Sequence, residues 1–176
     1  MSQIQPQIDF SIFPTSIGPC GIAWGERGIL ALQLPEADET QTRARLLRSC
    51  AHARPASAPA PLQRVIDDIV ALLEGERRHL QHAVLDMKGL SAFQRRVYGV
   101  TRTIEPGHTL SYGEVAKLCG DCRAARAVGQ ALGRNPFPII VPCHRVLGAG
   151  GKSGGFSAPG GVTTKLRLLS LESAAP

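Results

Sequence analysis

The chain has 176 residues, of which 43% are hydrophobic and 19% are charged, so it has the composition of a globular protein with one or two domains. No apolar run approaches the roughly 20 residues that cross a bilayer, and MSQIQPQIDF has neither the basic start nor the apolar core of a signal peptide. We therefore expect a cytoplasmic protein that makes no membrane contact and whose five cysteines are free thiols.

The first half of the chain has the pattern of a small α/β unit. Strands are predicted over residues 8–13, 20–24 and 28–34, with a hairpin turn at Glu26-Arg27-Gly28 between the last two. A helix is predicted over 39–52, and a Pro/Ala-rich loop follows it. Apolar residues at helical spacing predict a second helix over 62–75, which Gly75 ends.

A connector over residues 85–91 separates two parts of different charge. Residues 1–88 hold 9 basic and 10 acidic residues, whereas residues 89–176 hold 11 basic and 4 acidic ones. We therefore predict two domains, 1–88 and 89–176. A basic half beside a neutral half indicates a surface for a polyanion, most simply nucleic acid, although charge alone is equally compatible with a basic surface that has no partner.

The second half begins with helical segments. A helix over 92–104 is indicated by the spacing of its apolar residues. Ser111 and Glu114 form a predicted capping box at the start of a short helix that ends at Leu118. After a turn at Gly120, residues 122–135 predict another short helix. Two short helices joined by a glycine-containing turn are typical of a helix-turn-helix, although many helical bundles share that outline.

The second of these short helices is built from Ala, Gly and Arg. Small residues let a backbone approach another surface closely, and Arg123 and Arg126 are expected to project from it. Together with the basic charge of this half, this composition favours a helix that faces DNA over an ordinary alanine-rich helix.

A cysteine-histidine pair, Cys143-His144, follows a segment stiffened by three prolines and ends the apolar run of residues 138–141. A thiol is a nucleophile only as thiolate, and its free pKa is about 8.5. Adjacent residues of a strand point to opposite faces, so a direct bond between the two side chains is not guaranteed. A water or a turn would have to connect them. The alternative is a buried thiol beside a surface imidazole.

Three stretches closely resemble the O6-alkylguanine-DNA alkyltransferases, also called methylated-DNA–protein-cysteine methyltransferases. They are SYGEVAKLCG, AARAVGQALGRNPFPIIVPCHRV and GGVTTKLRLLSLE, and the likeness extends over residues 91–172. The first half agrees only in general character. The resemblance implies an α/β fold with an N-terminal ribonuclease-H-like α/β domain. It implies a mostly helical, winged helix-turn-helix-like domain that carries the active cysteine.

The resemblance also implies roles for single residues. Cys143 matches the alkyl acceptor, and His144 matches the histidine that takes the thiol proton through a water. Glu172 matches the acid that orients this histidine. Asn135 matches an asparagine that braces the surrounding segments, and Tyr112 matches a tyrosine beside the flipped nucleotide.

Further residues are implied in DNA binding and in the pocket for the flipped base. Arg126 matches the arginine that enters the duplex in place of that base, as suits a small-residue helix in the minor groove. The expected DNA-binding residues are Arg123, Ala124, Ala125, Arg126, Gly129 and Tyr112. The expected pocket residues are Pro142, Val146, Ser157 and Tyr112, and the carbonyls of Cys143 and Val146 would accept from the guanine amino group. Ala158-Pro159 departs from the usual loop, which affects the assignment of Ser157 to O6.

The implied function is direct reversal of O6-alkylguanine damage in double-stranded DNA by a monomer. The alkyl group would move irreversibly to Cys143, so each molecule would act once, without cofactor or metal. Repair of O4-methylthymine stays open. The alternatives are a lesion-binding module that transfers nothing, a helix-turn-helix regulator that prefers an operator sequence, and a cysteine hydrolase that turns over. Cys119 and Cys122 form a CxxC for which no further metal ligands with suitable spacing are found.

Overall fold

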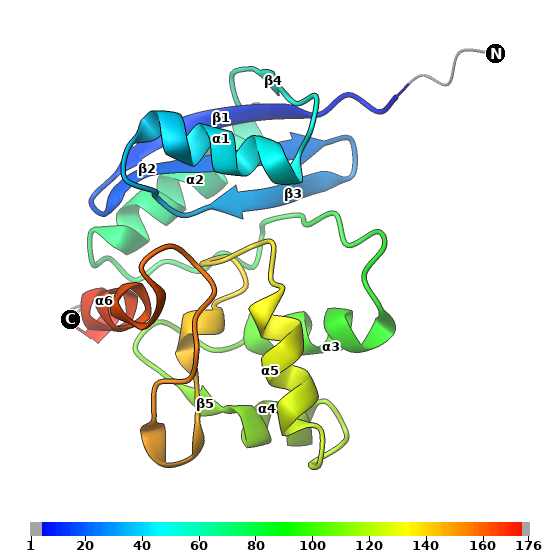
Figure 1. Ribbon diagram of the computed structural model, residues 1–176, viewed down its shortest axis with the longest axis vertical. Helices are drawn as coiled ribbons and strands as arrows, with labels where there is room; N and C mark the ends of the chain where they lie inside the picture. Colours follow the sequence, from blue (N-terminus) through cyan, green and yellow to red (C-terminus); the bar gives the residue numbers. More distant parts are fainter. Residues whose placement is uncertain (1–4, 174–176) are drawn as a thin grey trace.

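Three antiparallel strands form the first part of the computed structural model, which describes residues 5–173 (Figure 1). They are β1 (Asp9–Thr15), β2 (Gly18–Gly25) and β3 (Gly28–Gln33), and the short β4 (Arg54–Pro55) pairs with β1 in parallel. The strand order is β3-β2-β1-β4. Gly28 begins β3 with a φ of +125°, a conformation that side chains rarely adopt, so a glycine closes this hairpin.

Two helices cover the two faces of this sheet (Figure 1). Helix α1 (Glu39–Ser49) is capped by Asp38, whose side chain accepts from the Gln41 N–H, and it buries Leu46 against one face. Helix α2 (Ala60–Leu73) covers the other face with an apolar stripe that includes Ile66 and Ile69. The predicted strands and helices are therefore present, although α1 ends three residues earlier than predicted.

The second part is mostly helical. It contains α3 (Ala92–Thr101), α4 (Tyr112–Leu118), α5 (Ala125–Gly133) and α6 (Gly161–Ser173). The strands β5 (Leu110–Ser111) and β6 (Val146–Leu147) form a short parallel pair, and the 3-10 turns η1 (Cys143–Arg145) and η2 (Ala149–Gly151) lie on either side of β6.

Capping boxes begin two of these helices. The box predicted for Ser111 and Glu114 is present at α4, and a second one, between Ser91 and Gln94, begins α3. Helix α3 buries Val97, Tyr98 and Thr101, and Phe93 and Val100 pack partly buried against the same hydrophobic cluster. The predicted fold class, an α/β part followed by a mostly helical part, is confirmed.

The edge of β3 holds the second part against the sheet. The Leu32 N–H donates to the Pro136 carbonyl at 2.9 Å. The segment that leads into the second part pairs with the same strand, because the Ile29 N–H donates to the Val84 carbonyl at 2.8 Å. The largest hydrophobic cluster contains buried residues from both sides of residue 88, so the segment before Cys143 rests directly on the sheet. The division into domains at residue 88 stays a prediction.

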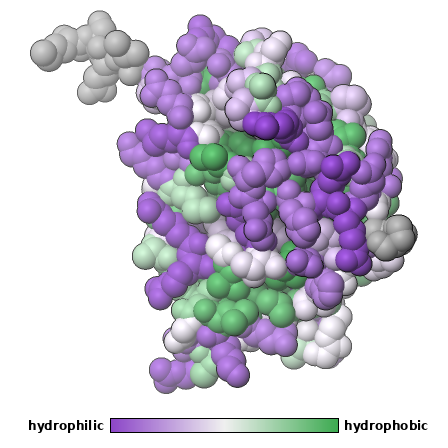
Figure 2. Space-filling model, turned by 180° about the vertical axis from the view of Figure 1, so that it is seen from behind, coloured by the Kyte–Doolittle hydropathy of each residue, from purple (hydrophilic) through white to green (hydrophobic). Residues whose placement is uncertain are grey.

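The surface is mainly polar. Figure 2 shows hydrophilic side chains over most of the face opposite to that of Figure 1, with an apolar area in its lower half. The large apolar side chains most exposed in the described residues are those of Val84, Leu118, Val162 and Leu166. Among residues 5–173, no helix combines the length and the hydropathy that crossing a bilayer requires.

Candidate functional site

The segment from Asn135 to Cys143 is a series of tight turns rather than a strand. The Asn135 side chain closes it at both ends: its Nδ2 donates to the Val141 carbonyl and its Oδ1 accepts from the Phe137 N–H, each at 2.9 Å. Ile139, which is β-branched, has a φ of +72°, a conformation that such residues rarely adopt. The alternation of side chains expected for a strand therefore does not apply here. The turns fix where the thiol lies.

The Cys143 thiol is nearly buried at the wall of a cleft. Cys143 begins the turn η1, and its N–H donates to the Val141 carbonyl at 2.7 Å. Only 8% of the residue is exposed. Burial raises the pKa of this thiol, and the Asn135 amide and the Lys165 ammonium oppose that rise. The resting thiol is therefore protonated, and a neighbouring base has to accept its proton before it attacks.

His144 and Glu172 form a buried hydrogen-bonded pair. His144 Nε2 lies 2.7 Å from Glu172 Oε1, and the two side chains are 1% and 4% exposed. The same carboxylate accepts two bonds from Arg145 Nε and one from Arg145 Nη2, and Arg145 Nη1 donates to the Ile104 carbonyl. Burial alone would raise the pKa of Glu172, but the bonds from His144 and Arg145 lower it to about 2. Glu172 is thus a carboxylate at neutral pH.

The environment of His144 leaves one ring nitrogen free to act as a base. Burial lowers the pKa of His144, although the carboxylate of Glu172 opposes this, so the ring is neutral. Because Nε2 faces a carboxylate, Nε2 carries the proton of the neutral ring. Nδ1 is then a lone-pair acceptor, and it has no hydrogen-bond partner among the described residues. No direct bond between the Cys143 and His144 side chains is present among those residues.

Lys165, which was not predicted from the sequence, is fully buried, and its positive charge acts on the Cys143 thiol. Its Nζ donates to the Val146 carbonyl at 2.7 Å and lies 5.7 Å from the centre of the Tyr112 ring. Arg145 was missed as well. The helical period offers a signal for Lys165, because Lys165, Leu168 and Glu172 share the buried face of α6.

The residues predicted to bind DNA lie along α5 and just before it. Arg126 is exposed on α5, and Arg123 precedes the helix with 92% of its side chain exposed. Ala124 and Ala125 are partly buried. A groove of about 630 Å³ runs between α4 and α5, and its lining includes Tyr112, Ala125, Arg126 and Gly129. The structure therefore brings five of the six predicted DNA-binding residues to this groove or directly beside it, and places Arg123 in the preceding turn.

Of the four predicted pocket residues, Ser157 lines the cleft next to Cys143, whereas Pro142, Val146 and Tyr112 do not. Pro142 and Val146 are buried on either side of η1, and the Val146 carbonyl already accepts from Lys165 Nζ. Ser157 is exposed and lines the same cleft as Cys143. A Cβ on Gly154 would lie 2.7 Å from the Tyr112 hydroxyl, so glycine lets the loop approach this ring.

Of the remaining four cysteines, only Cys50 lines the cleft that Cys143 borders. Cys20 and Cys50 are buried thiols of the core, as predicted, and Cys119 is buried whereas Cys122 is exposed. All five cysteines are free, which confirms the expectation of free thiols.

Comparison with known proteins gives a consistent result. Residues 92–174 match the family model described as 6-O-methylguanine DNA methyltransferase, DNA binding domain. The methylated-DNA–protein-cysteine methyltransferase of Methanothermobacter thermautotrophicus is 36% identical over 152 residues, which are 86% of this chain and 78% of that protein.

Solved structures agree over almost the full length. The Mycobacterium tuberculosis O6-methylguanine methyltransferase has a TM-score of 0.75 at 35% identity, and the match covers 97% of this chain and 95% of that one. The same enzyme in complex with DNA has a TM-score of 0.74 at 36% identity, covering 96% and 95% of the two chains. The family predicted from the sequence is therefore confirmed: the chain belongs to the methylated-DNA–protein-cysteine methyltransferases.

Proposed function

We propose that this protein repairs O6-alkylguanine in double-stranded DNA by moving the alkyl group to Cys143. It is a methylated-DNA–protein-cysteine methyltransferase, a DNA-binding protein that reverses the damage directly. The observation that carries the assignment of Cys143 is its setting. The thiol borders an open cleft and is followed in the chain by neutral His144, whose Nε2 is hydrogen-bonded to the Glu172 carboxylate.

The chemical step follows from these contacts. His144 Nδ1 takes the thiol proton through a water, and the imidazolium that forms is stabilised by Glu172. The sulfur then attacks the alkyl carbon, so an S–C bond forms while the C–O6 bond breaks. The electron pair of that bond returns to the guanine, which regains a proton and is restored. The product is a thioether without a ready leaving group, so each molecule acts once.

Access to the alkyl group requires that the damaged base leave the helix. O6 lies inside the duplex, and extruding a base costs a few kcal/mol, which is less for a lesion that pairs badly. Helix α5 enters the minor groove, where its small residues allow close approach and exposed Arg126 fills the space of the extruded base. Tyr112, in the groove beside α5, lies next to the flipped nucleotide. The protein acts as a monomer, because one chain contains all of these groups.

The lysine and asparagine near Cys143 support the same reaction. Asn135 fixes the turns that present the thiol, and Lys165 places a positive charge near the sulfur that becomes a thiolate. Ser157 lines the same cleft as Cys143, which supports the predicted contact with O6, and Ala158 and Pro159 line that cleft beside it.

The Cys143→Ser variant tests the assignment against a lesion-binding module. It is expected to bind a duplex that contains O6-methylguanine as tightly as the unchanged protein, and to accept no methyl group. Cys122→Ser, which changes an exposed cysteine away from the cleft, is the matched control and is expected to transfer normally. Stoichiometric transfer by Cys143→Ser would refute the assignment, and lesion binding without transfer by the unchanged protein would favour the binding module.

A further inference from the structure

The cleft beside Cys143 is larger than a methyl group requires. Its volume is about 460 Å³, within the range of pockets that hold small molecules. One wall comes from the first part of the chain, including Arg45 of α1 and residues of β3. The other wall comes from the segment Gly133–Pro138, from Cys143 and from the loop Phe156–Pro159. The cleft therefore begins at the reactive sulfur and extends to the first helix.

The charged side chains that line this cleft are all positive. Its lining includes two guanidinium groups, Arg45 and Arg134, one on each wall, and contains no aspartate or glutamate. Neither arginine forms a salt bridge with any other residue among 5–173. Arg43, two residues from Arg45 on the same helix, pairs with Glu39 at 3.0 Å instead.

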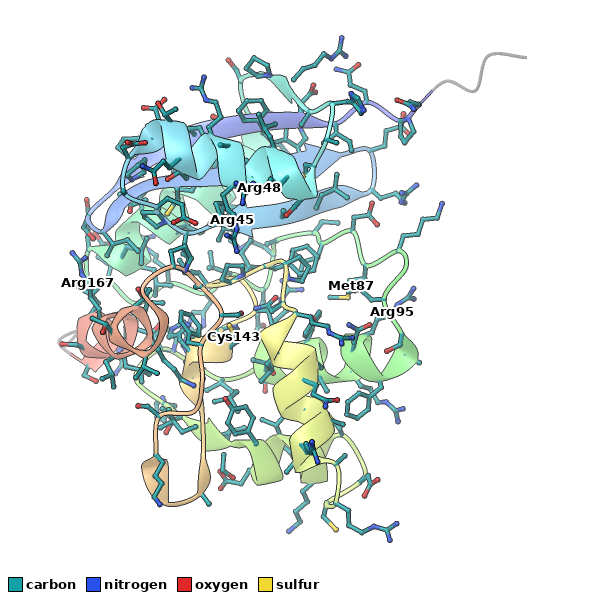
Figure 3. The ribbon with its side chains drawn as sticks, in the orientation of Figure 1. Arg45, Arg48, Met87, Arg95, Cys143 and Arg167 are labelled. Carbon is teal, nitrogen blue, oxygen red and sulfur yellow. The ribbon has the colours of Figure 1, made fainter. Side chains whose placement is uncertain are left out.

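Figure 3 shows how these groups lie relative to the thiol. The Arg45 side chain extends from α1 toward the part of the molecule that holds Cys143. A guanidinium presents several N–H donors in a plane that matches a carboxylate, and two such groups without acidic partners favour an anion between them. An anion held by these two side chains would lie in the same cleft as the Cys143 thiol.

We infer that this cleft is a subsite for alkyl groups that end in a carboxylate, and that Arg45 and Arg134 select them. The inference rests on the proposed function. During transfer the carbon bonded to O6 has to lie next to Cys143 Sγ, so the remainder of the alkyl group extends into the cleft that opens there. The substrate class is O6-alkylguanine with a short acidic chain, of which O6-carboxymethylguanine is the simplest.

The reaction on such a lesion is balanced without a further reactant. The sulfur forms a bond to the methylene carbon, the bond from that carbon to O6 breaks, and the guanine takes back the proton that the thiol gave up. The carboxylate takes no part in bond making. It is held by the two guanidinium groups while the thioether S-carboxymethylcysteine forms.

The test compares two lesions of nearly equal size, one charged and one neutral. Single-turnover rate constants are measured on duplexes with O6-carboxymethylguanine or with O6-carbamoylmethylguanine, and their ratio is taken for each protein. We expect this ratio to fall about fivefold in Arg45→Gln and in Arg134→Gln, the size of a partly exposed charge pair. It is expected to stay unchanged in the control Arg43→Gln, and Arg45→Lys is expected to restore part of it.

Two results would overturn the inference. A ratio that is the same in all four variants as in the unchanged protein would mean that the arginines do not contact the alkyl group. Equal slowing of both lesions in Arg45→Gln or Arg134→Gln would mean that these side chains serve the DNA phosphates. O6-methylguanine in the same assay separates the two proposals. Failure to transfer its methyl group would contradict the proposed function. Methyl transfer together with an unchanged ratio of the two rate constants would contradict this inference alone.

Discussion

Glu172 accepts hydrogen bonds from two buried side chains, those of His144 and Arg145. These bonds determine the ionisation of Glu172 and the tautomer of His144. Arg145 supplies the positive charge that keeps the carboxylate ionised, and the carboxylate holds the proton of His144 on Nε2. Removing one member of a buried charged pair is costly because the other is left without a partner. The acceptor nitrogen of His144 therefore depends on a residue, Arg145, that touches neither the thiol nor the cleft.

Replacing Glu172 with glutamine is expected to destabilise the protein in a pH-dependent way. The pKa of Glu172 is lowered from its ordinary 4.5 to about 2, so its stabilising effect is present above pH 4.5 and is lost as the pH falls toward 2. At pH 7 the free energy of unfolding is expected to fall by on the order of 3 kcal/mol. Denaturant unfolding of Glu172→Gln between pH 7 and pH 2 measures this, with exposed Glu105→Gln as the control. A difference that does not shrink toward pH 2 would contradict the pairing.

Replacing Lys165 with methionine is expected to change the pH dependence of alkyl transfer. The Lys165 ammonium lowers the pKa of the Cys143 thiol, so its loss is expected to raise that pKa and to slow transfer near neutral pH. Single-turnover rates across pH are the measurement. The rate of Lys165→Met should recover at higher pH, whereas Lys152→Met on the exposed loop should follow the unchanged protein. Slowing by the same factor at every pH would indicate a packing role instead.

The sequence predicts the residues of this site unequally. Cys143, His144 and Glu172 stand in motifs that resemble a known family, so their roles were expected before any contact was known. Arg145 and Lys165 were not, because long cationic side chains usually lie at the surface and are buried only when a partner compensates the charge. Their partners, Glu172 and the Val146 carbonyl, are 27 and 19 residues away in the chain, a separation that no local pattern encodes.

At the scale of elements, α5 is the proposed DNA-binding helix, and the segment before Cys143 positions the thiol for the chemical step. The segment owes its shape to Asn135 and to an unusual backbone at Ile139, and proline positions alone could not predict those turns. Helix α5 was easier to predict, because its small residues and its exposed Arg126 form a local pattern. Its role in DNA binding stays a proposal.

Arg126→Ala is expected to separate base extrusion from chemistry. Arg126 is exposed on the groove and distant in the chain from Cys143, so its loss should slow repair in a duplex by at least about tenfold, the effect of about 1.4 kcal/mol lost from the flipped state. The rate with free O6-methylguanine base should not change, because no base has to leave a stack. Both rates are measured by the amount of methylated protein over time. Equal slowing of the two reactions would count against this role.

At the scale of the molecule, the thiol is held between two parts of the chain that share a hydrophobic cluster. A backbone hydrogen bond from Leu32 of β3 to the Pro136 carbonyl joins the sheet edge to the segment before Cys143. The charge asymmetry and the connector predicted two units, but a sequence pattern does not report how tightly two units pack. The cleft next to Cys143 exists only because both units line it.

Because the cluster is shared, the two parts are expected to unfold together. The single tryptophan, Trp24, lies in β2 and reports the first part, whereas far-ultraviolet circular dichroism reports mainly the helices. We expect both signals to give the same midpoint in thermal unfolding, as a cooperative transition requires. Two separate midpoints would show that the parts are independent.

The most direct measurement of the central claim is the intact mass of the protein after mixing with a duplex that contains one O6-methylguanine, followed by peptide mapping. We expect a mass gain of one methylene group per molecule, located on Cys143, that does not increase with more DNA or more time. No mass gain despite binding of the lesion, or a methyl group on another residue, would contradict it.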